Sequence, residues 1–170
     1  MTNRETLRSL AERVLFLDID GVVLNGRALW HTGNNKYLPP EKVALIREVC
    51  DRTGCLIVVS STWRYSDTTA DMLRAVGLPL HADWRTDWKN DMVGSIIQGQ
   101  RRGVEIHRWL ARHLGVSYAI IDDDSDMLLE QMPYFVKTDH EEGVEQWHVD
   151  ALVEILTGAA ASLRAIGEGL

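Results

Sequence analysis

The sequence predicts an α/β protein of three layers, in which helices cover both faces of a parallel β-sheet. Short apolar runs, typical of strands buried on both faces, alternate along the chain with segments of helical periodicity. Such alternation implies right-handed crossovers between parallel strands. A length of 170 residues favours one domain. We assign residues 1–158 to this domain and residues 159–170 to a C-terminal tail, either helical or disordered.

Four apolar runs are the main predicted strands, at residues 14–17, 56–59, 118–121 and 134–137, and residues 78–81 are a candidate edge strand. Polar residues follow three of these runs directly: Asp18 and Asp20, then Ser60, then Asp122. Because ligands bind at the carboxyl ends of strands in open α/β sheets, we expect these groups to converge at one site.

Helices are predicted from apolar stripes and from residues that start or stop a helix. A short helix is expected within residues 1–13, and longer ones from Pro40 to Thr53, from Asp67 to Gly77, from residue 103 to Gly115 and before Gly158. Trp109, Leu114 and Trp147 are expected to face the core. Residues 22–38 are predicted to be irregular and residues 83–101 to form a polar loop.

The composition is acidic, with a net charge of −7 and a pI near 5.3. This charge argues against a protein that tracks a long phosphate backbone, but not against one that acts on a nucleotide or a nucleic-acid end. The sequence shows neither a transmembrane-length apolar stretch nor a signal peptide, so we expect a cytoplasmic protein with no membrane contact. Cys50 and Cys55 match no metal or redox spacing and are expected to be reduced packing residues.

Asp18 and Asp20 project to the same side of an extended chain, so their charges require a cation or a proton nearby. The acidic run at residues 122–126 follows an apolar strand directly, which favours ligands over a solvated loop. Carboxylates of this kind suit Mg²⁺. With hydroxyls and an arginine nearby, they indicate phosphoryl transfer.

One stretch, Phe16-Leu17-Asp18-Ile19-Asp20-Gly21-Val22, resembles the first motif of the haloacid dehalogenase (HAD) superfamily, mostly phosphohydrolases that work through an aspartyl-phosphate. The resemblance implies a Rossmann-like fold, capless or with a minimal cap because residues 22–38 are too few for a folded cap. It implies that Asp18 is the nucleophile and that Asp20 is the general acid and base, whose backbone carbonyl also binds the metal. Ser60 matches the hydroxyl that binds the phosphoryl group, with Ser61 and Thr62 as alternatives.

The later motifs leave two alternatives open. Arg102-Gly103 resembles the Lys-Gly start of the third motif, with Arg101 as the competing assignment. Asp122-Asp123 resembles the acidic pair of the fourth motif, in which Asp123 would bind Mg²⁺ directly and Asp122 is the second candidate. A further acid usually follows four residues later, and Asp126 fits only when counted from Asp122.

Together these segments look like the small capless HAD domains associated with RNA-repair proteins. The resemblance implies a Mg²⁺-dependent phosphomonoesterase, acting on a nucleotide or a nucleic-acid terminal phosphate. Trp30 and Trp63 flank two motifs and are predicted to contact substrate, while Arg64 is either a second phosphate contact or a surface salt bridge. The alternatives are a phosphoprotein or small-metabolite phosphatase, and a catalytically silent HAD-like binding module.

Overall fold

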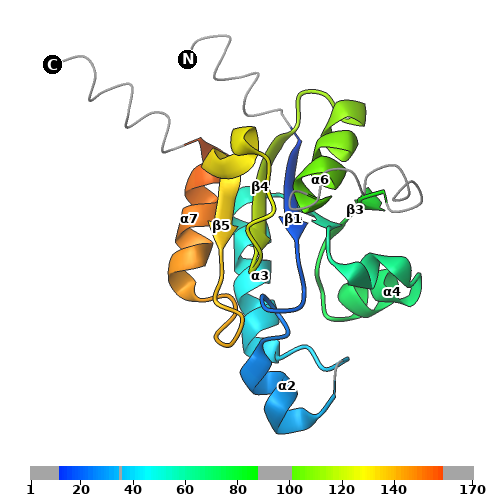
Figure 1. The fold of residues 1–170 in the computed structure, drawn as a ribbon, viewed down its shortest axis with the longest axis vertical. Helices are drawn as coiled ribbons and strands as arrows, with labels where there is room; N and C mark the ends of the chain where they lie inside the picture. The colour runs from blue at the N-terminus through cyan, green and yellow to red at the C-terminus, as the bar shows by residue number, and fades with distance from the viewer. Residues whose placement is uncertain (1–11, 35, 88–100, 159–170) are drawn as a thin grey trace, which may run out of the picture.

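The computed structural model describes residues 12–34, 36–87 and 101–158, with Arg101 described by its backbone alone. Five strands form one parallel sheet in the order β3-β2-β1-β4-β5 (Figure 1). They are β1 (Arg13–Leu17), β2 (Leu56–Val59), β3 (Leu80–Arg85), β4 (Ser117–Asp122) and β5 (Phe135–Lys137). The predicted tail, and all but the end of the predicted N-terminal helix, lie outside the described residues.

Alternating side chains of β1 face opposite layers, which confirms the three-layer prediction. Leu15 and Leu17 belong to one hydrophobic cluster, which includes residues of α3 (Pro40–Thr53) and α7 (Gln146–Thr157). Val14 and Phe16 point to the other face, where Trp109 of α6 (Arg101–Arg112) meets the Phe16 ring edge-on at 5.3 Å. A strand with a period of two can be apolar at every position only when both faces are covered.

A short helix, α2 (Gly26–Thr32), occupies part of the segment that was predicted to be irregular. The Asn25 side chain accepts a hydrogen bond from the backbone N–H of Ala28 at 3.1 Å, which caps the helix. No residue of α2 is buried, so the helix lacks the apolar stripe that would have revealed it. Figure 1 shows α2 beyond the carboxyl ends of the strands.

The edge strand β3 continues to Arg85, whereas the sequence predicted an end at residue 81 and a loop from residue 83. This strand is only partly buried and its pairing with β2 shifts register, so it shows no continuous apolar run. Thr86 and Asp87 follow β3 without regular structure, residues 88–100 lie outside the described residues, and Arg101, predicted to end the loop, is the first residue of α6.

The predicted helices between strands are present, and α4 spans Thr68–Ala75. A 3₁₀ turn, η2 (Leu129–Tyr134), precedes β5. Trp109 is fully buried as predicted, but Leu114 and Trp147 are 88% and 58% exposed, so their assignment to the core was wrong. Leu114 lies beyond the end of α6, and the Trp147 ring stacks on His148 in the first turn of α7. Cys50 and Cys55 are buried free thiols, as predicted.

A buried ion pair joins α6 to the 3₁₀ turn η1 (Thr62–Tyr65) that follows β2. Arg64 Nη2 lies 2.8 Å from Glu105 Oε2, and both side chains are almost fully buried. Arg64 Nη1 also donates to the backbone carbonyls of Ser60 and Ser61, at 2.7 and 2.9 Å. The pair therefore fixes the loop after β2 against the helix on the neighbouring layer.

Replacing one partner of this ion pair should destabilise the fold strongly. Arg64→Met removes the cation that faces the buried Glu105 carboxylate, and loss of one partner of a buried ion pair typically costs about 3–5 kcal/mol. Urea unfolding followed by circular dichroism measures the change. Arg52→Met is the matched control, because Arg52 pairs with Glu48 and Asp150 at the surface and should change the stability little. Equal losses in the two variants would contradict a structural role for the buried pair.

Candidate active site

Strand order brings three sequence-distant polar segments together. The chain continues from β1 outward to β2 and β3, then returns to build β4 and β5 on the other side of β1. The crevice outside the carboxyl ends of β1 and β4 is therefore a topological switch point, where α/β sheets bind ligands. Asp18 N donates to Ile121 O at 3.1 Å, and Ser60 N donates to Leu17 O at 3.0 Å. These bonds set the ends of β2 and β4 on either side of Asp18.

A glycine turn follows Asp18 and Asp20, the two aspartates that come after β1. Gly21 has a φ of +77°, and a Cβ at this position would collide with the Asp123 carboxylate. The hydroxyl of Thr138, at the end of β5, donates to Gly21 O at 2.8 Å and holds the turn in place. The turn thus lets the ends of β1, β4 and β5 approach closely, which a residue with a side chain would prevent.

Three carboxylates gather at this edge. Asp18, Asp122 and Asp123 each offer one oxygen, and these oxygens lie within 4.8 Å of one another. Burial raises the pKa of Asp18 to about 6, with the Arg102 charge opposing the rise. Burial, and then the charge of Asp18, raise the pKa of Asp122 to about 8. Anions held this closely favour a cation among them, and their hard oxygen donors suit Mg²⁺.

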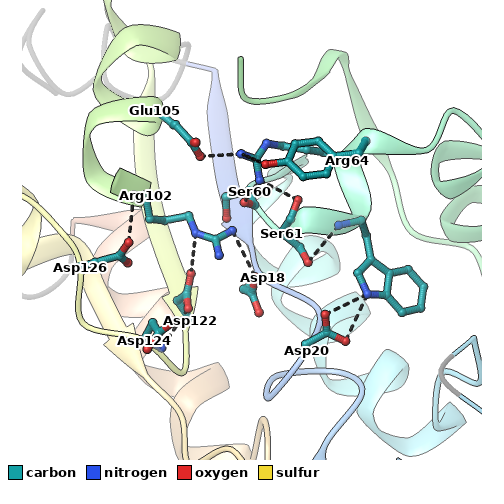
Figure 2. Close-up of polar contacts among 12 residues, drawn as sticks. Asp18, Asp20, Ser60, Ser61, Arg64, Arg102, Glu105, Asp122, Asp124 and Asp126 are labelled. Atoms are coloured by element: carbon teal, nitrogen blue, oxygen red, sulfur yellow. Dashed lines mark hydrogen bonds and ion pairs between the residues drawn. The ribbon is translucent and has the colours of Figure 1, made fainter. Parts of the chain in front are cut away.

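Arg102 is the cation that the fold supplies (Figure 2). Its Nη1 lies 3.2 Å from Asp18 Oδ1, and its Nε lies 3.4 Å from Asp122 Oδ2. Asp126 secures the start of α6, because its carboxylate accepts from Arg102 N and its carbonyl accepts from Gly103 N, both at 3.0 Å. Asp126 is thus a helix cap outside the three-acid group. The side chain of the competing Arg101 lies outside the described part of the chain.

The hydroxyls after β2 have different surroundings. Ser60 is fully buried, and its Oγ has no hydrogen-bond partner among the described residues. Ser61 is buried too and its Oγ accepts from Trp63 N at 3.4 Å, whereas Thr62 is exposed beside a pocket of about 110 Å³. A buried hydroxyl without a partner is costly unless a ligand supplies one. Of the three residues, Ser60 therefore best fits a role in binding substrate.

Asp20 lies apart from the three-acid group, although only one residue, Ile19, separates it from Asp18. Its carboxylate receives the indole N–H of Trp63, with Nε1 at 3.1 Å from Oδ1 and 3.0 Å from Oδ2. Figure 2 shows the Asp20 carboxylate turned toward this indole. The indole N–H of Trp63 is thus bound to a catalytic candidate, a contact that the predicted role of Trp63 in contacting substrate did not include.

The two remaining candidates differ in exposure. Arg64 is only 2% exposed, so the predicted surface salt bridge is wrong, and its guanidinium is directed at Glu105 and the carbonyls of the loop after β2. Trp30 is 87% exposed on α2, a position open to solvent near the carboxyl edge of the sheet (Figure 1).

Sequence reasoning missed His140, in the loop that follows β5. Its Nδ1 lies 2.7 Å from Asp123 Oδ2, and this hydrogen bond raises the pKa of His140. The sequence could have identified His140 by its position. It lies three residues beyond a predicted strand and therefore at the same edge of the sheet as the acids. Glu105 was missed as well, because its partner Arg64 is remote in sequence.

Among the described helices, none is long and apolar enough to cross a bilayer. Comparison with curated proteins gave no match, and neither did comparison with solved structures. A family model described as the HAD domain in Swiss Army Knife RNA repair proteins matches residues 14–149, which include the described strands from Val14 onward and all the site residues discussed above. The chain therefore belongs to this RNA-repair-associated family of the HAD superfamily.

Proposed function

We propose that the protein is a Mg²⁺-dependent phosphomonoesterase that removes a terminal phosphate from a nucleotide or a nucleic-acid end through an aspartyl-phosphate. One observation carries this proposal: buried Asp18 contacts Arg102 and lies beside two further carboxylates at the switch point. Ser60 follows the end of the neighbouring strand β2, and its Oγ has no hydrogen-bond partner in the described part of the chain. Family membership supports a hydrolase of phosphorylated substrates.

The donor set fits Mg²⁺. Asp18 and Asp123 are the better ligands, because both oxygens of Asp122 already have a neighbour, Asp124 N at Oδ1 and the Arg102 guanidinium at Oδ2. The carbonyl of Asp20 is a further ligand by resemblance to the family. Bound Mg²⁺ would neutralise charge on the phosphoryl oxygens and on these acids. The His140 ring forms a hydrogen bond to the Asp123 carboxylate through Nδ1 and so orients that ligand.

The first half of the reaction forms the covalent intermediate. An Asp18 carboxylate oxygen attacks phosphorus, and the bond between phosphorus and the leaving oxygen breaks. Arg102 and the Ser60 hydroxyl hold the phosphoryl oxygens in which charge accumulates. Asp20, protonated at this stage, gives its proton to the leaving oxygen and becomes a carboxylate.

The second half regenerates the enzyme. Asp20, now a carboxylate, takes a proton from water, and the resulting hydroxide attacks phosphorus of the aspartyl-phosphate. The bond between Asp18 and phosphorus breaks, which releases inorganic phosphate and leaves Asp20 protonated for the next cycle. The two aspartates therefore need different surroundings, and the structure provides them.

A nucleic-acid end is the substrate that the surface features favour. Trp30 presents an exposed indole on α2, beyond the carboxyl ends of the strands, and a base stacked on such a ring gains about 1–3 kcal/mol. Residues 21–40 contain no Asp or Glu, although the chain as a whole is acidic. The net charge of −7 confines favourable contact to the last one or two nucleotides.

Asp18→Asn should abolish turnover of phosphomonoesters while the fold is retained, because the amide is nearly isosteric but cannot attack phosphorus. Aryl phosphate hydrolysis with Mg²⁺ measures the loss, and circular dichroism tests the fold. Beryllofluoride should bind the wild type in a Mg²⁺-dependent manner as an acyl-phosphate mimic, and should not bind the variant. Substantial residual turnover would remove Asp18 from the role of nucleophile, and an inactive wild type would favour the binding module.

Asp122→Asn should stabilise the metal-free protein increasingly as the pH rises. A carboxyl group whose pKa rises from 3.8 to about 8 on folding stabilises the fold below pH 4, and this contribution is lost as the pH rises toward 8. The melting temperature of the variant relative to wild type, measured in EDTA between pH 4 and pH 8, should therefore increase. A difference that is independent of pH would contradict the raised pKa.

Trp30→Ala should raise KM for phosphorylated oligonucleotides and mononucleotides by roughly fivefold or more, since it removes the stacking surface. KM for an aryl phosphate should stay the same. Leu114→Ala is the matched control, because Leu114 is equally exposed but follows α6 at the opposite edge of the sheet.

A panel of phosphorylated oligonucleotides, phosphopeptides and sugar phosphates tests the substrate class through kcat/KM. A kcat/KM for phosphopeptides or sugar phosphates that exceeds that for oligonucleotides by more than about tenfold would overturn the nucleic-acid assignment.

A further inference from the structure

The contact between Trp63 and Asp20 joins a catalytic candidate to a side chain that cannot take part in proton transfer. A single indole N–H lies between both carboxylate oxygens, at 3.1 and 3.0 Å. Indole nitrogen is a donor only, so it attracts the carboxylate without competing for the proton that Asp20 must carry. The contact can therefore fix the direction of the carboxylate without accepting the proton that Asp20 carries.

Trp63 is itself held firmly. Its carbonyl accepts from Ser66 N at 3.1 Å and from the Thr69 hydroxyl, on α4, at 2.7 Å. Its ring packs, partly buried, against the main hydrophobic cluster. The other partner is also restrained, because Gly21 N donates to Leu24 O at 2.8 Å in the turn after Asp20. A contact between two fixed elements is suited to positioning a functional group.

This contact accounts for the separation between the two aspartates that come after β1. Asp18 is buried against Arg102, in the group with Asp122 and Asp123. Asp20 points instead toward the indole (Figure 2). Without the indole N–H, the Asp20 carboxylate would be free to rotate toward any cation held by the three acids, and would then be lost for proton transfer.

We propose that Trp63 is a positioning residue for Asp20, which it holds outside the acid cluster, in the orientation needed for proton transfer. The proposal rests on the proposed phosphomonoesterase function. It replaces base stacking as the role of Trp63, and base stacking becomes one outcome of the test.

Two substitutions separate the roles. Trp63→Phe removes the N–H and keeps an aromatic ring, whereas Trp63→Leu removes both. Positioning predicts that both variants lose at least tenfold in kcat on aryl phosphate and on a nucleoside monophosphate, with KM within about twofold of wild type. The loss should be greater for the nucleoside monophosphate, whose poorer leaving group depends more on protonation. Melting temperature and Mg²⁺ affinity should be retained, and Trp84→Phe, in a partly buried tryptophan of β3, should leave kcat unchanged.

Stacking predicts a different pattern. Trp63→Phe should then have kcat and KM close to those of wild type, and Trp63→Leu should have a higher KM for the nucleotide alone. That pattern would overturn the proposal. A wild type that turns over and a Trp63→Phe variant with unchanged kcat would overturn it without affecting the proposed function. A wild type inactive on every phosphomonoester would instead remove the proposed function, and the proposal with it.

The contact has a readout that needs no turnover. The chain has six tryptophans, so ¹H–¹⁵N spectra contain few indole signals, and Trp63→Phe identifies the one from Trp63. Asp20→Ala should shift this signal and speed its exchange with solvent. A Trp63 indole signal that is unchanged in Asp20→Ala would overturn the proposal, whatever the activity.

Discussion

The interaction on which the site depends is the contact of Arg102 with Asp18 and Asp122. Burying two carboxylates next to each other is unfavourable, and the raised pKa values of both show that one guanidinium compensates only in part. The position of Arg102 depends in turn on where α6 begins. Gly103 allows this start, because a Cβ there would lie 2.5 Å from Leu128 N, and Asp126 caps it.

The same helix also sets the loop that carries the hydroxyls. Glu105 lies one turn beyond Arg102 on α6, and it pairs with Arg64, whose guanidinium binds the carbonyls of Ser60 and Ser61. Arg102 and Ser60 are thus linked through one buried ion pair, that of Glu105 with Arg64. A displacement of α6 would move both groups together, so their relative geometry is preserved.

Sequence reasoning recovered what depends on local pattern. The apolar runs of β1, β2 and β4 revealed the sheet, and parallel pairing then implied that Asp18, Ser60 and Asp122 converge, as they do. Sequence reasoning failed where the burial of a side chain depends on a partner distant in sequence. It also failed where an element is too little buried to show an apolar pattern. Arg64 is buried because Glu105, 41 residues away, neutralises it. Helix α2 has a side-chain cap but no buried face, and the edge strand β3 has no uniform apolar run, so neither showed a clear period.

The balance of charge at the site implies an order of binding for the proposed reaction. Three acidic side chains are clustered, while Arg102 and the exposed His140 are the basic side chains seen to contact them in the described part of the chain. A phosphate monoester that approached this group alone would be repelled by those of its carboxylates that are ionised. A divalent cation reverses the local charge, and it also lowers the cost of keeping Asp18 ionised for attack. Binding of the cation should therefore precede productive binding of the phosphate. In the proposed reaction, the bound cation neutralises the charge on the three acids that Arg102 leaves uncompensated.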